Sequence, residues 1–425
     1  MMKKPSSMKI LILLTFFSSA LFSIITPMAR ELSIALTLGS EEVISTINSI
    51  FLMVAAISSI FWAILGDKIK RKVLLVIATF EWSTLILFTI FAFDFYSLLL
   101  FQIFTAIGFG AALPLVFSLT VDFVEPEKRG KEFGLLSAIY VLGNGLGQVL
   151  SGFLIDAYPW QTPLIIVSVG GFICTGLLFL VNEPRRGGLD KFYKQTDNSQ
   201  EKIDYKIRIE DIKIIGKIKS TIWILLLNFT MFIAIGSISS FFISMLKNDY
   251  LLSSTLATVF LIIVFGSQVP SGPIFGKLGD KLRIKSVKGR MKIALICLSC
   301  GSILYIIGFS LFFVSTSLIS AFIFLIFAFS GAFLFGGIDP LTQATLGEIN
   351  PPQIRSTIYS INYLTYSFGR SISLILLGKF FLTFNNNYSP GYVILAILAL
   401  ICSLFLVPIF KNLPKDIERI NSGEL

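Results

Sequence analysis

A short basic segment occurs twice in this chain. The first copy, FWAILGDKIKRK, spans residues 61–72, and the second, IFGKLGDKLRIK, spans residues 274–285. Both contain Leu-Gly-Asp-Lys followed by further positive charge, and their aspartates lie 280 − 67 = 213 residues apart. A second set of residues recurs 226 residues later: Pro114, Asp122 and Arg129 return as Pro340, Glu348 and Arg355. The two offsets differ by 226 − 213 = 13 residues, and a longer basic stretch around residues 281–293 accounts for this difference. The chain is therefore predicted to contain two parallel copies of one structural unit.

The composition places these copies in a membrane. Hydrophobic residues make up 55% of the 425 residues and charged residues only 14%, whereas a soluble protein carries about a quarter charged residues. A span needs about 20 apolar residues. Runs of that length occur near residues 10–29, 44–65, 73–93, 97–121, 132–156, 162–182, 219–246, 253–276, 291–314, 318–346, 356–382 and 389–411. We predict an all-α integral membrane protein with twelve transmembrane helices in two pseudo-symmetric six-helix bundles.

The predicted domains follow from these runs. Residues 1–182 form the N-terminal bundle, residues 183–218 a cytoplasmic linker, and residues 219–425 the C-terminal bundle with a short tail. Isoleucines recur in the linker at roughly helical spacing, with charges between them, which is typical of an amphipathic helix on a membrane surface. This helix is either an interfacial connection between the bundles or a regulatory docking site.

Lysine and arginine are distributed unevenly over the predicted loops. Both tails, the central linker and the alternate loops on the same side hold 31 of the 35 basic residues. Cytoplasmic loops of membrane proteins collect Lys and Arg. We therefore expect both termini on the cytoplasmic side of the plasma membrane. The same asymmetry accounts for the net charge of +10, so the lipid bilayer is the expected partner and nucleic acid is not.

Several classes of chemistry lack their residues. The chain has no histidine, and its Cys297-x-x-Cys300 pair lies inside an apolar run. A thiolate is costly in a span, so we predict neither a metal site nor a redox pair there. No glycine-rich loop ending in Gly-Lys-Ser/Thr is present to bind nucleotide. The sequence predicts no cofactor and no enzymatic activity.

The loops and repeats resemble the major facilitator superfamily over nearly the whole chain. AILGDKIKRK, at residues 63–72, is similar to the most recognisable loop motif of that family, apart from Lys70 where glycine is usual. The fifth span contains GNGLGQVLSG, similar to the glycine-rich fifth-helix motif, so Gly143 and Gly147 are predicted to permit close helix packing between the halves. Phe104 stands where the fourth-span motif of drug–proton antiporters has an arginine. The run ending in Glu-Pro-Arg-Arg-Gly at 183–187 resembles the spinster-like branch, which is associated with lysolipids and other amphiphiles.

The resemblance implies a gating role for the repeated loops. A carboxylate at a helix end can accept hydrogen bonds from the N–H groups at the start of a neighbouring helix. In the family that neighbour belongs to the other half, and the contact holds the outward-open state. The predicted gating residues are Gly66, Asp67, Arg71 and Asp122 in the first half, and Gly279, Asp280 and Glu348, with Arg283 or Lys285, in the second. The alternative is a solvated basic loop that only fixes topology.

Polar groups inside the spans are costly and therefore indicate function. Asp339 lies about 13 Å from the end of the tenth span and Arg370 about 21 Å into the eleventh, at about 1.5 Å per residue. Because these spans run antiparallel, the two charges are predicted to come within reach of each other. Polar residues four apart share a face with them or with each other. We predict that the solute cavity is lined by Asp339, Gln343, Asn362, Tyr366, Arg370, Asn144 and Gln148.

Two functional roles fit Asp339, namely exchange of a proton or binding of a cationic group. A static ion pair with Arg370 is the structural alternative. Glu81, in the third span, is expected to be a neutral carboxyl packed against another helix. The function predicted is secondary active transport of a small organic or amphiphilic solute by rocker-switch alternating access, by a monomer, with protons as one option for coupling. The alternative is a transport-inactive sensor or scaffold with the same fold.

Overall fold

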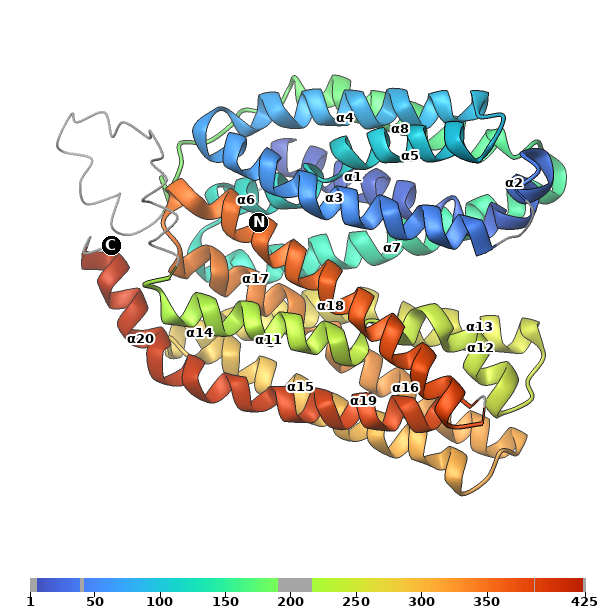
Figure 1. Cartoon of the computed structure of the whole chain (residues 1–425). Coiled ribbons are helices and arrows are strands. Elements are labelled where there is room, and N and C mark those ends of the chain that lie inside the picture. Colours follow the sequence, from blue (N-terminus) through green and yellow to red (C-terminus); the bar gives the residue numbers. More distant parts are fainter. Residues whose placement is uncertain (1–5, 39–41, 190–215, 386, 423–425) are drawn as a thin grey trace. The chain divides into compact units, whose positions relative to one another are not determined.

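The computed structural model describes residues 6–38, 42–189, 216–385 and 387–422 (Figure 1). Every regular element among these residues is a helix. The amphipathic helix predicted in the linker falls largely on residues 190–215, which lie outside the described residues. The fold class predicted from the sequence is confirmed.

The first half of the chain forms the helices that its six predicted spans require. Among them α4 packs against α8 and α5, and α1 packs against α8 and α6 (Figure 1). The elements are α1 (Ser6–Ser23), α2 (Ala29–Ala35), α3 (Glu42–Lys68), α4 (Arg71–Phe88), α5 (Phe95–Phe109), α6 (Ala112–Phe123), α7 (Arg129–Ala157) and α8 (Gln161–Leu178).

The second half repeats this pattern. Its central helix, α15, packs against α14, α16 and α19, and α11 packs against α19 and α20. The elements are α11 (Lys219–Ile235), α12 (Ile238–Asp249), α13 (Ser254–Gly266), α14 (Gln268–Lys285), α15 (Gly289–Ser310), α16 (Leu318–Phe335), α17 (Ile338–Ile349), α18 (Arg355–Thr383), α19 (Ser389–Cys402) and α20 (Leu406–Ser422).

Three stretches predicted as single spans are each broken into two helices by a proline. Pro114, Pro270 and Pro340 are the third residues of α6, α14 and α17. A proline has no N–H, so it cannot bond to the carbonyl four residues earlier, and it is tolerated best in the first turn of a helix. In all three cases that carbonyl belongs to a glycine: Gly110, Gly266 and Gly336. The breaks before α6 and α17 are 226 residues apart, as is the repeat itself.

One helix is more polar than a typical span. Eleven stretches of the described chain are long and apolar enough to cross a membrane, and α18 is not among them. Yet α18 has 29 residues, which is about 43 Å at about 1.5 Å per residue. Asn362, Tyr366 and Arg370 lie one turn apart along it and lower its hydropathy. This helix supplies the twelfth span of the architecture.

The chain divides into two compact units that follow the halves of the sequence, except for two exchanged segments. Unit 1 contains residues 1–123, 139–211 and 352–364, and unit 2 contains residues 124–138, 212–351 and 365–425. The start of α18 therefore belongs with the helices of the first half, and the start of α7 belongs with those of the second. The domains predicted from the sequence divide the chain only at the linker. They do not include the exchange of these two segments, because the exchange arises from contacts and not from chain order.

Candidate functional site

The end of α3 caps the start of α18. Asp67, 1% exposed, accepts hydrogen bonds from the N–H groups of Ser356 (2.9 Å) and Thr357 (2.9 Å) and from the Thr357 hydroxyl (2.6 Å). The first N–H groups of a helix have no partner within it, and the helix dipole favours negative charge there. A Cβ on Gly66 would overlap the side chain of Leu115, so a larger residue here would require that side chain to move. We call this contact the α3–α18 cap.

A buried charge network lies beside the α3–α18 cap. Arg71, the first residue of α4, pairs with Asp122 of α6 at 2.7 Å and donates to the Ser118 hydroxyl at 2.8 Å. The second carboxylate oxygen of Asp122 accepts from Arg355, the first residue of α18, at 3.1 Å. Buried charges are stable only when they are paired in this way. The structure pairs two of the predicted gating residues, Arg71 and Asp122, and it adds Arg355, to which no role was assigned from the sequence.

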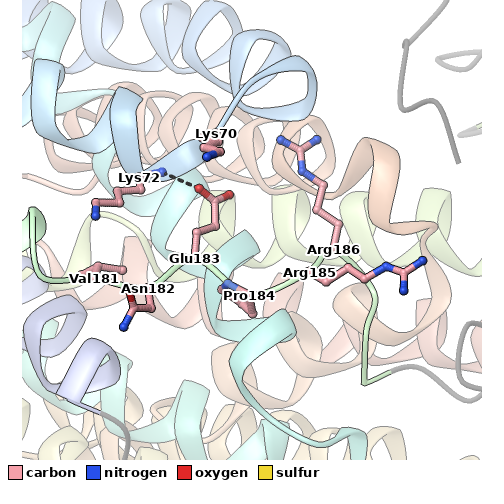
Figure 2. A pocket seen from close by; sticks show the side chains of 8 residues that line it. All are labelled: Lys70, Lys72, Val181, Asn182, Glu183, Pro184, Arg185 and Arg186. Carbon is pink, nitrogen blue, oxygen red and sulfur yellow. Dashed lines mark hydrogen bonds between the residues drawn. The ribbon is translucent and has the colours of Figure 1, made fainter. Parts of the chain in front are cut away.

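The segment after α8 holds the start of α4 (Figure 2). The Glu183 carboxylate accepts from the backbone N–H groups of Arg71 and Lys72, each at 3.1 Å, and from Nε of Arg71 at 3.1 Å. It therefore caps α4 from outside that helix, as Asp67 caps α18.

The same segment also holds the end of α3. Arg186 donates to the backbone carbonyl oxygens of Gly66, Asp67 and Ile69, where the helix leaves carbonyl groups without partners. The N–H of Gly187 donates to Asp122 at 3.0 Å. A pocket of about 510 Å³ is lined here by Lys70, Lys72 and residues 181–186 (Figure 2). The sequence analysis used this segment only as a sign of resemblance and did not foresee that it fixes the α3–α18 cap in place.

The second copy of the loop makes the equivalent contact in unit 2. Asp280 of α14 accepts hydrogen bonds from the N–H groups of Gly130 (2.9 Å) and Lys131 (2.8 Å) in the first turn of α7. A Cβ on Gly279 would overlap Leu341, as one on Gly66 would overlap Leu115. We call this contact the α14–α7 cap.

The charge network beside the α14–α7 cap is built around a residue that sequence reasoning missed. Arg290 of α15, 1% exposed, pairs with Asp280 at 2.8 Å and with Glu348 at 2.8 Å. Arg283 also pairs with Glu348, whereas Lys285 is exposed. Arg290 lies in the first turn of α15, as Arg71 lies in the first turn of α4. The longer basic loop places Arg290 ten residues after Asp280, where the repeat did not reveal it.

Asp339 lies at the start of α17 and is surrounded by neutral donors. Its carboxylate accepts from the hydroxyl of Ser137 on α7 (2.8 Å), the hydroxyl of Tyr366 on α18 (2.5 Å) and the amide of Gln343 one turn along α17 (3.1 Å). Gln343 also donates to Tyr366 at 3.0 Å. Three of the predicted cavity residues therefore form one cluster with Ser137, which the sequence analysis did not include. Its signal is its position in α7, seven residues before Asn144.

Arg370 does not pair with Asp339, contrary to the ion pair considered from the sequence. It donates a hydrogen bond to the hydroxyl of Ser240 on α12, at 3.3 Å. Spacing along α18 explains the difference. Tyr366 occupies the place beside Asp339, and Arg370 lies one turn further along the same helix. No ion pair joins Arg370 or Asp339 to any residue that the structure describes.

The remaining cavity candidates are in unit 1. The amide of Gln148 donates to the side-chain oxygen of Asn144 at 2.9 Å, and the backbone oxygen of Asn144 accepts from Ser23 at 2.8 Å. Asn362 is buried in the segment that α18 contributes to this unit.

The predicted glycines of α7 lie close to α1, in their own half of the chain. A Cβ on Gly143 would overlap Ser19, and one on Gly147 would lie 2.5 Å from the Ser23 hydroxyl, both on α1. The close approach to the second half is made earlier in α7. There a Cβ on Gly134 would lie 2.5 Å from the carbonyl carbon of Gly272 on α14.

Comparison with known proteins places this geometry in a family. The family model described as Major Facilitator Superfamily matches residues 11–304 and 289–425. The proton:xylose symporter XylE is 16% identical, with a TM-score of 0.68 and coverage of 96% of each chain. FucP in its outward conformation is 15% identical, with a TM-score of 0.71 and coverage of 95% of this chain and 98% of that one. These structures share the fold.

Relatives by sequence match shorter stretches. Multidrug resistance protein 3 of Bacillus subtilis is 32% identical over 101 residues, which are 23% of this chain and 17% of the relative. The putative niacin/nicotinamide transporter NiaP of Bacillus subtilis is 26% identical over 137 residues, 32% of this chain and 34% of the relative. The chain thus aligns with 17% and 34% of the length of these two proteins.

Proposed function

Because this chain belongs to the Major Facilitator Superfamily, we propose that the α3–α18 cap and the α14–α7 cap are the contacts that break and re-form during its transport cycle. The chain is a multi-pass membrane protein and a secondary transporter. The proposed cycle is rocker-switch alternating access, in which both caps close the cytoplasmic side while the solute site faces outward. Both termini lie on that cytoplasmic side in the plasma membrane, and the working unit is a monomer without enzymatic activity.

One observation carries this proposal: both loop aspartates bind the start of a helix from the other half of the sequence. Asp67 and Ser356 are separated by 289 residues, and Asp280 and Gly130 by 150. A solvated loop that only fixes topology would need neither contact. An N-cap contributes roughly 1 kcal/mol, so a pair of such caps is weak enough to open in each cycle.

The cluster around Asp339 supports proton coupling. Proton exchange at Asp339 would break no ion pair, because the described groups that bind its carboxylate are two hydroxyls and an amide. The titratable side chain that touches it is Tyr366, and the nearest carboxylate along α17, Glu348, is bound by Arg283 and Arg290. We therefore assign proton exchange to Asp339, with Gln343 and Tyr366 as its positioning residues.

The solute is proposed to be a small organic or amphiphilic molecule that contacts the polar faces of α7, α17 and α18. The names of the relatives include a niacin/nicotinamide transporter and a multidrug resistance protein, and XylE is a proton:xylose symporter. These names support small organic molecules as the class of substrate, and they favour no single compound within that class.

The test is a thermal-shift screen of the purified protein followed by exchange measurements. Sugars, amino acids, nucleosides, organic cations, organic anions and lysolipids are screened, because a ligand of the folded state raises its apparent stability. Each stabilising compound is then measured for exchange across proteoliposomes against liposomes without protein. We expect saturable exchange of at least one compound. If compounds bind the protein but none of them is exchanged across the proteoliposome membrane, the result would contradict transport and favour a sensor.

A further inference from the structure

Arg370 lies at the middle of α18. It is 370 − 355 = 15 residues from the first residue of the helix and 383 − 370 = 13 from the last, or about 22 Å and 20 Å at about 1.5 Å per residue. The hydrocarbon core of a bilayer is about 30 Å thick. The guanidinium is therefore held at the depth where a charge costs most.

The position of Arg370 on the helix directs it away from lipid. Tyr366, Arg370 and Ser373 share one face, by their spacing of three and four residues. The opposite face carries Phe368, Ile375 and Leu382, which are 49%, 61% and 74% exposed. Large exposed apolar side chains of a membrane helix suit contact with lipid, so the Arg370 face is the one turned to protein and water.

The surroundings of Arg370 in unit 2 are closely packed on one side and polar on the other. A Cβ on Gly236, at the junction of α11 and α12, would lie 2.9 Å from Cα of Arg370. One turn further on, the N–H of Ser237 donates to the hydroxyl of Ser373 at 3.0 Å. The backbone of Arg370 is thus fixed against this junction, while its side chain extends along α12 to Ser240.

The charge of Arg370 lacks a counter-charge among the described residues. A guanidinium has five N–H donors and stays protonated in proteins, and here it makes one long hydrogen bond to a neutral hydroxyl. The carboxylate of Asp339 on α17 is bound by Ser137, Tyr366 and Gln343 and makes no ion pair with Arg370. A charge at this depth is stable when it faces water or binds an ion of opposite sign.

We propose that Arg370 binds the anionic group of the transported solute, so that the substrate class is small organic anions with a carboxylate or a similar oxyanion. This inference rests on the proposed transport function and names its substrate. A planar oxyanion accepts two parallel hydrogen bonds from a guanidinium, a geometry stronger and more specific than a single bond to a hydroxyl.

An aromatic pair lies next to this anion site and suits an apolar body on the same solute. Phe232 and Tyr366 are stacked with ring centroids 4.3 Å apart. They precede Gly236 and Arg370 by one turn on their respective helices. A solute whose oxyanion lies on Arg370 places its carbon skeleton along these rings, between the guanidinium and the Asp339 cluster.

The experiment compares three probes that share a ring and differ in charge: benzoate, benzylammonium and benzyl alcohol. A panel of aliphatic carboxylates and benzenesulfonate extends the anions. Affinities are measured by thermal shift and by calorimetry on the purified wild type, Arg370→Gln, Arg370→Lys and Lys379→Gln. Lys379 is the matched control, because it is a cation on the same helix but on its exposed face.

We expect anions to stabilise the wild type more than the cation or the alcohol does. Arg370→Gln should bind them at least tenfold more weakly, Arg370→Lys should retain part of the affinity, and Lys379→Gln should match the wild type. The melting curve without ligand shows whether each variant is folded. The inference is overturned if no anion of the panel stabilises the wild type, or if folded Arg370→Gln binds the anions as tightly as the wild type does.

Exchange measurements separate this inference from the proposed function. Exchange of a neutral or cationic solute, unchanged in Arg370→Gln, would leave transport standing and remove the anion site. Binding of anions that depends on Arg370, with no exchange of any probe, would leave the site standing and remove transport.

Discussion

Carboxylates that bind the first N–H groups of a neighbouring helix recur throughout the described part of the chain. Asp67 and Asp280 cap helices of the other half, whereas Glu183, Asp249 and Asp416 cap helices of their own half. The chemistry is the same in both groups. What distinguishes a contact that must open from one that only stabilises is the helix to which the donors belong, and this gives each proposed moving cap a static counterpart for comparison.

Replacing Asp67 by Asn is expected to slow transport at least tenfold while solute affinity stays within about twofold. The amide keeps one acceptor oxygen but places an NH₂ group against the N–H donors of α18, and it removes the charge that favours the helix dipole. The measurement is exchange in proteoliposomes beside calorimetric binding.

The control for that variant is Asp249→Asn, which makes the same change in the static cap of α19, where Asp249 accepts from the N–H groups of Tyr388 and Ser389. It should lower thermal stability and leave the exchange rate of the folded protein unchanged. Equal exchange rates in wild type and Asp67→Asn would show that the α3–α18 cap does not limit the cycle.

Asp339→Asn is expected to make transport independent of pH. The variant keeps one oxygen, for either Ser137 or Tyr366, because these hydroxyls bind different oxygens of the carboxylate, and it can no longer exchange a proton. In the wild type, transport driven by an inward proton gradient should rise as the outer pH falls, and this dependence should vanish in the variant. The rate of exchange is measured between pH 5.5 and 8 in both proteins, about the range in which proton-coupled groups are expected to work. Parallel pH profiles would reduce Asp339 to a structural role.

Single residues were predicted well where the repeat marks them and poorly where contacts decide. The aspartates of both loops stand at equivalent places in the sequence, and the structure gives them equivalent contacts. Arg290 was missed because the longer second loop displaces it from its repeat position. Asp339 and Arg370 were predicted to come within reach of each other from their depths alone. Depth along a helix cannot tell which of two residues one turn apart, Tyr366 or Arg370, takes the place beside the carboxylate.

At the scale of helices, the sequence predicted the spans but not their breaks. The glycine four residues before Pro114, Pro270 and Pro340 is readable in the sequence, and it marks each break once the missing proline N–H is considered. Hydropathy does not reveal the breaks, because each broken stretch still scores as one continuous apolar span. It also undervalues α18, because polar residues spaced one turn apart lower the hydropathy of this helix.

The crossing of α7 and α14 depends on glycine at one point. Gly134→Ala would bring a methyl group against the backbone of Gly272, so we expect the helices to be forced apart at a cost of about 1–3 kcal/mol. The matched control is Gly145→Ala on the same helix, where a Cβ would meet nothing within 4 Å. Thermal unfolding should show a lower melting temperature for the first variant and an equal or higher one for the second. Equal stability of both would mean that the crossing adapts.

At the scale of the whole molecule, the positive charge predicts the orientation in the membrane. Lys415 on α20 and Tyr96 at the start of α5 are both exposed. Each is replaced by Cys in a chain whose four cysteines are Ser. We expect a membrane-impermeant maleimide to label Tyr96→Cys on intact cells, and Lys415→Cys only after the membrane is opened. The reverse pattern would invert the topology and place both caps outside.

The architecture could be predicted from the sequence because it rests on quantities that add along the chain, namely apolar length, the sign of loop charge and the offset of a repeat. The exchange of segments 124–138 and 352–364 between the units could not. It depends on which carboxylate binds the first turn of which helix, and such contacts between distant parts of the chain cannot be read from the order of residues.

The hydrogen-exchange rates of the capped amide groups would also report how often each cap opens. The amide hydrogens of Ser356 and Thr357 are bound to Asp67, and those of Gly130 and Lys131 to Asp280. An amide in such a contact exchanges with deuterated water only while the contact is open. Peptides from residues 352–364 and 124–138 would therefore take up deuterium at rates that report the opening of each cap separately. A solute that holds both caps closed would slow deuterium uptake in both peptides. A solute that opens one cap before the other would speed uptake in one peptide before the other.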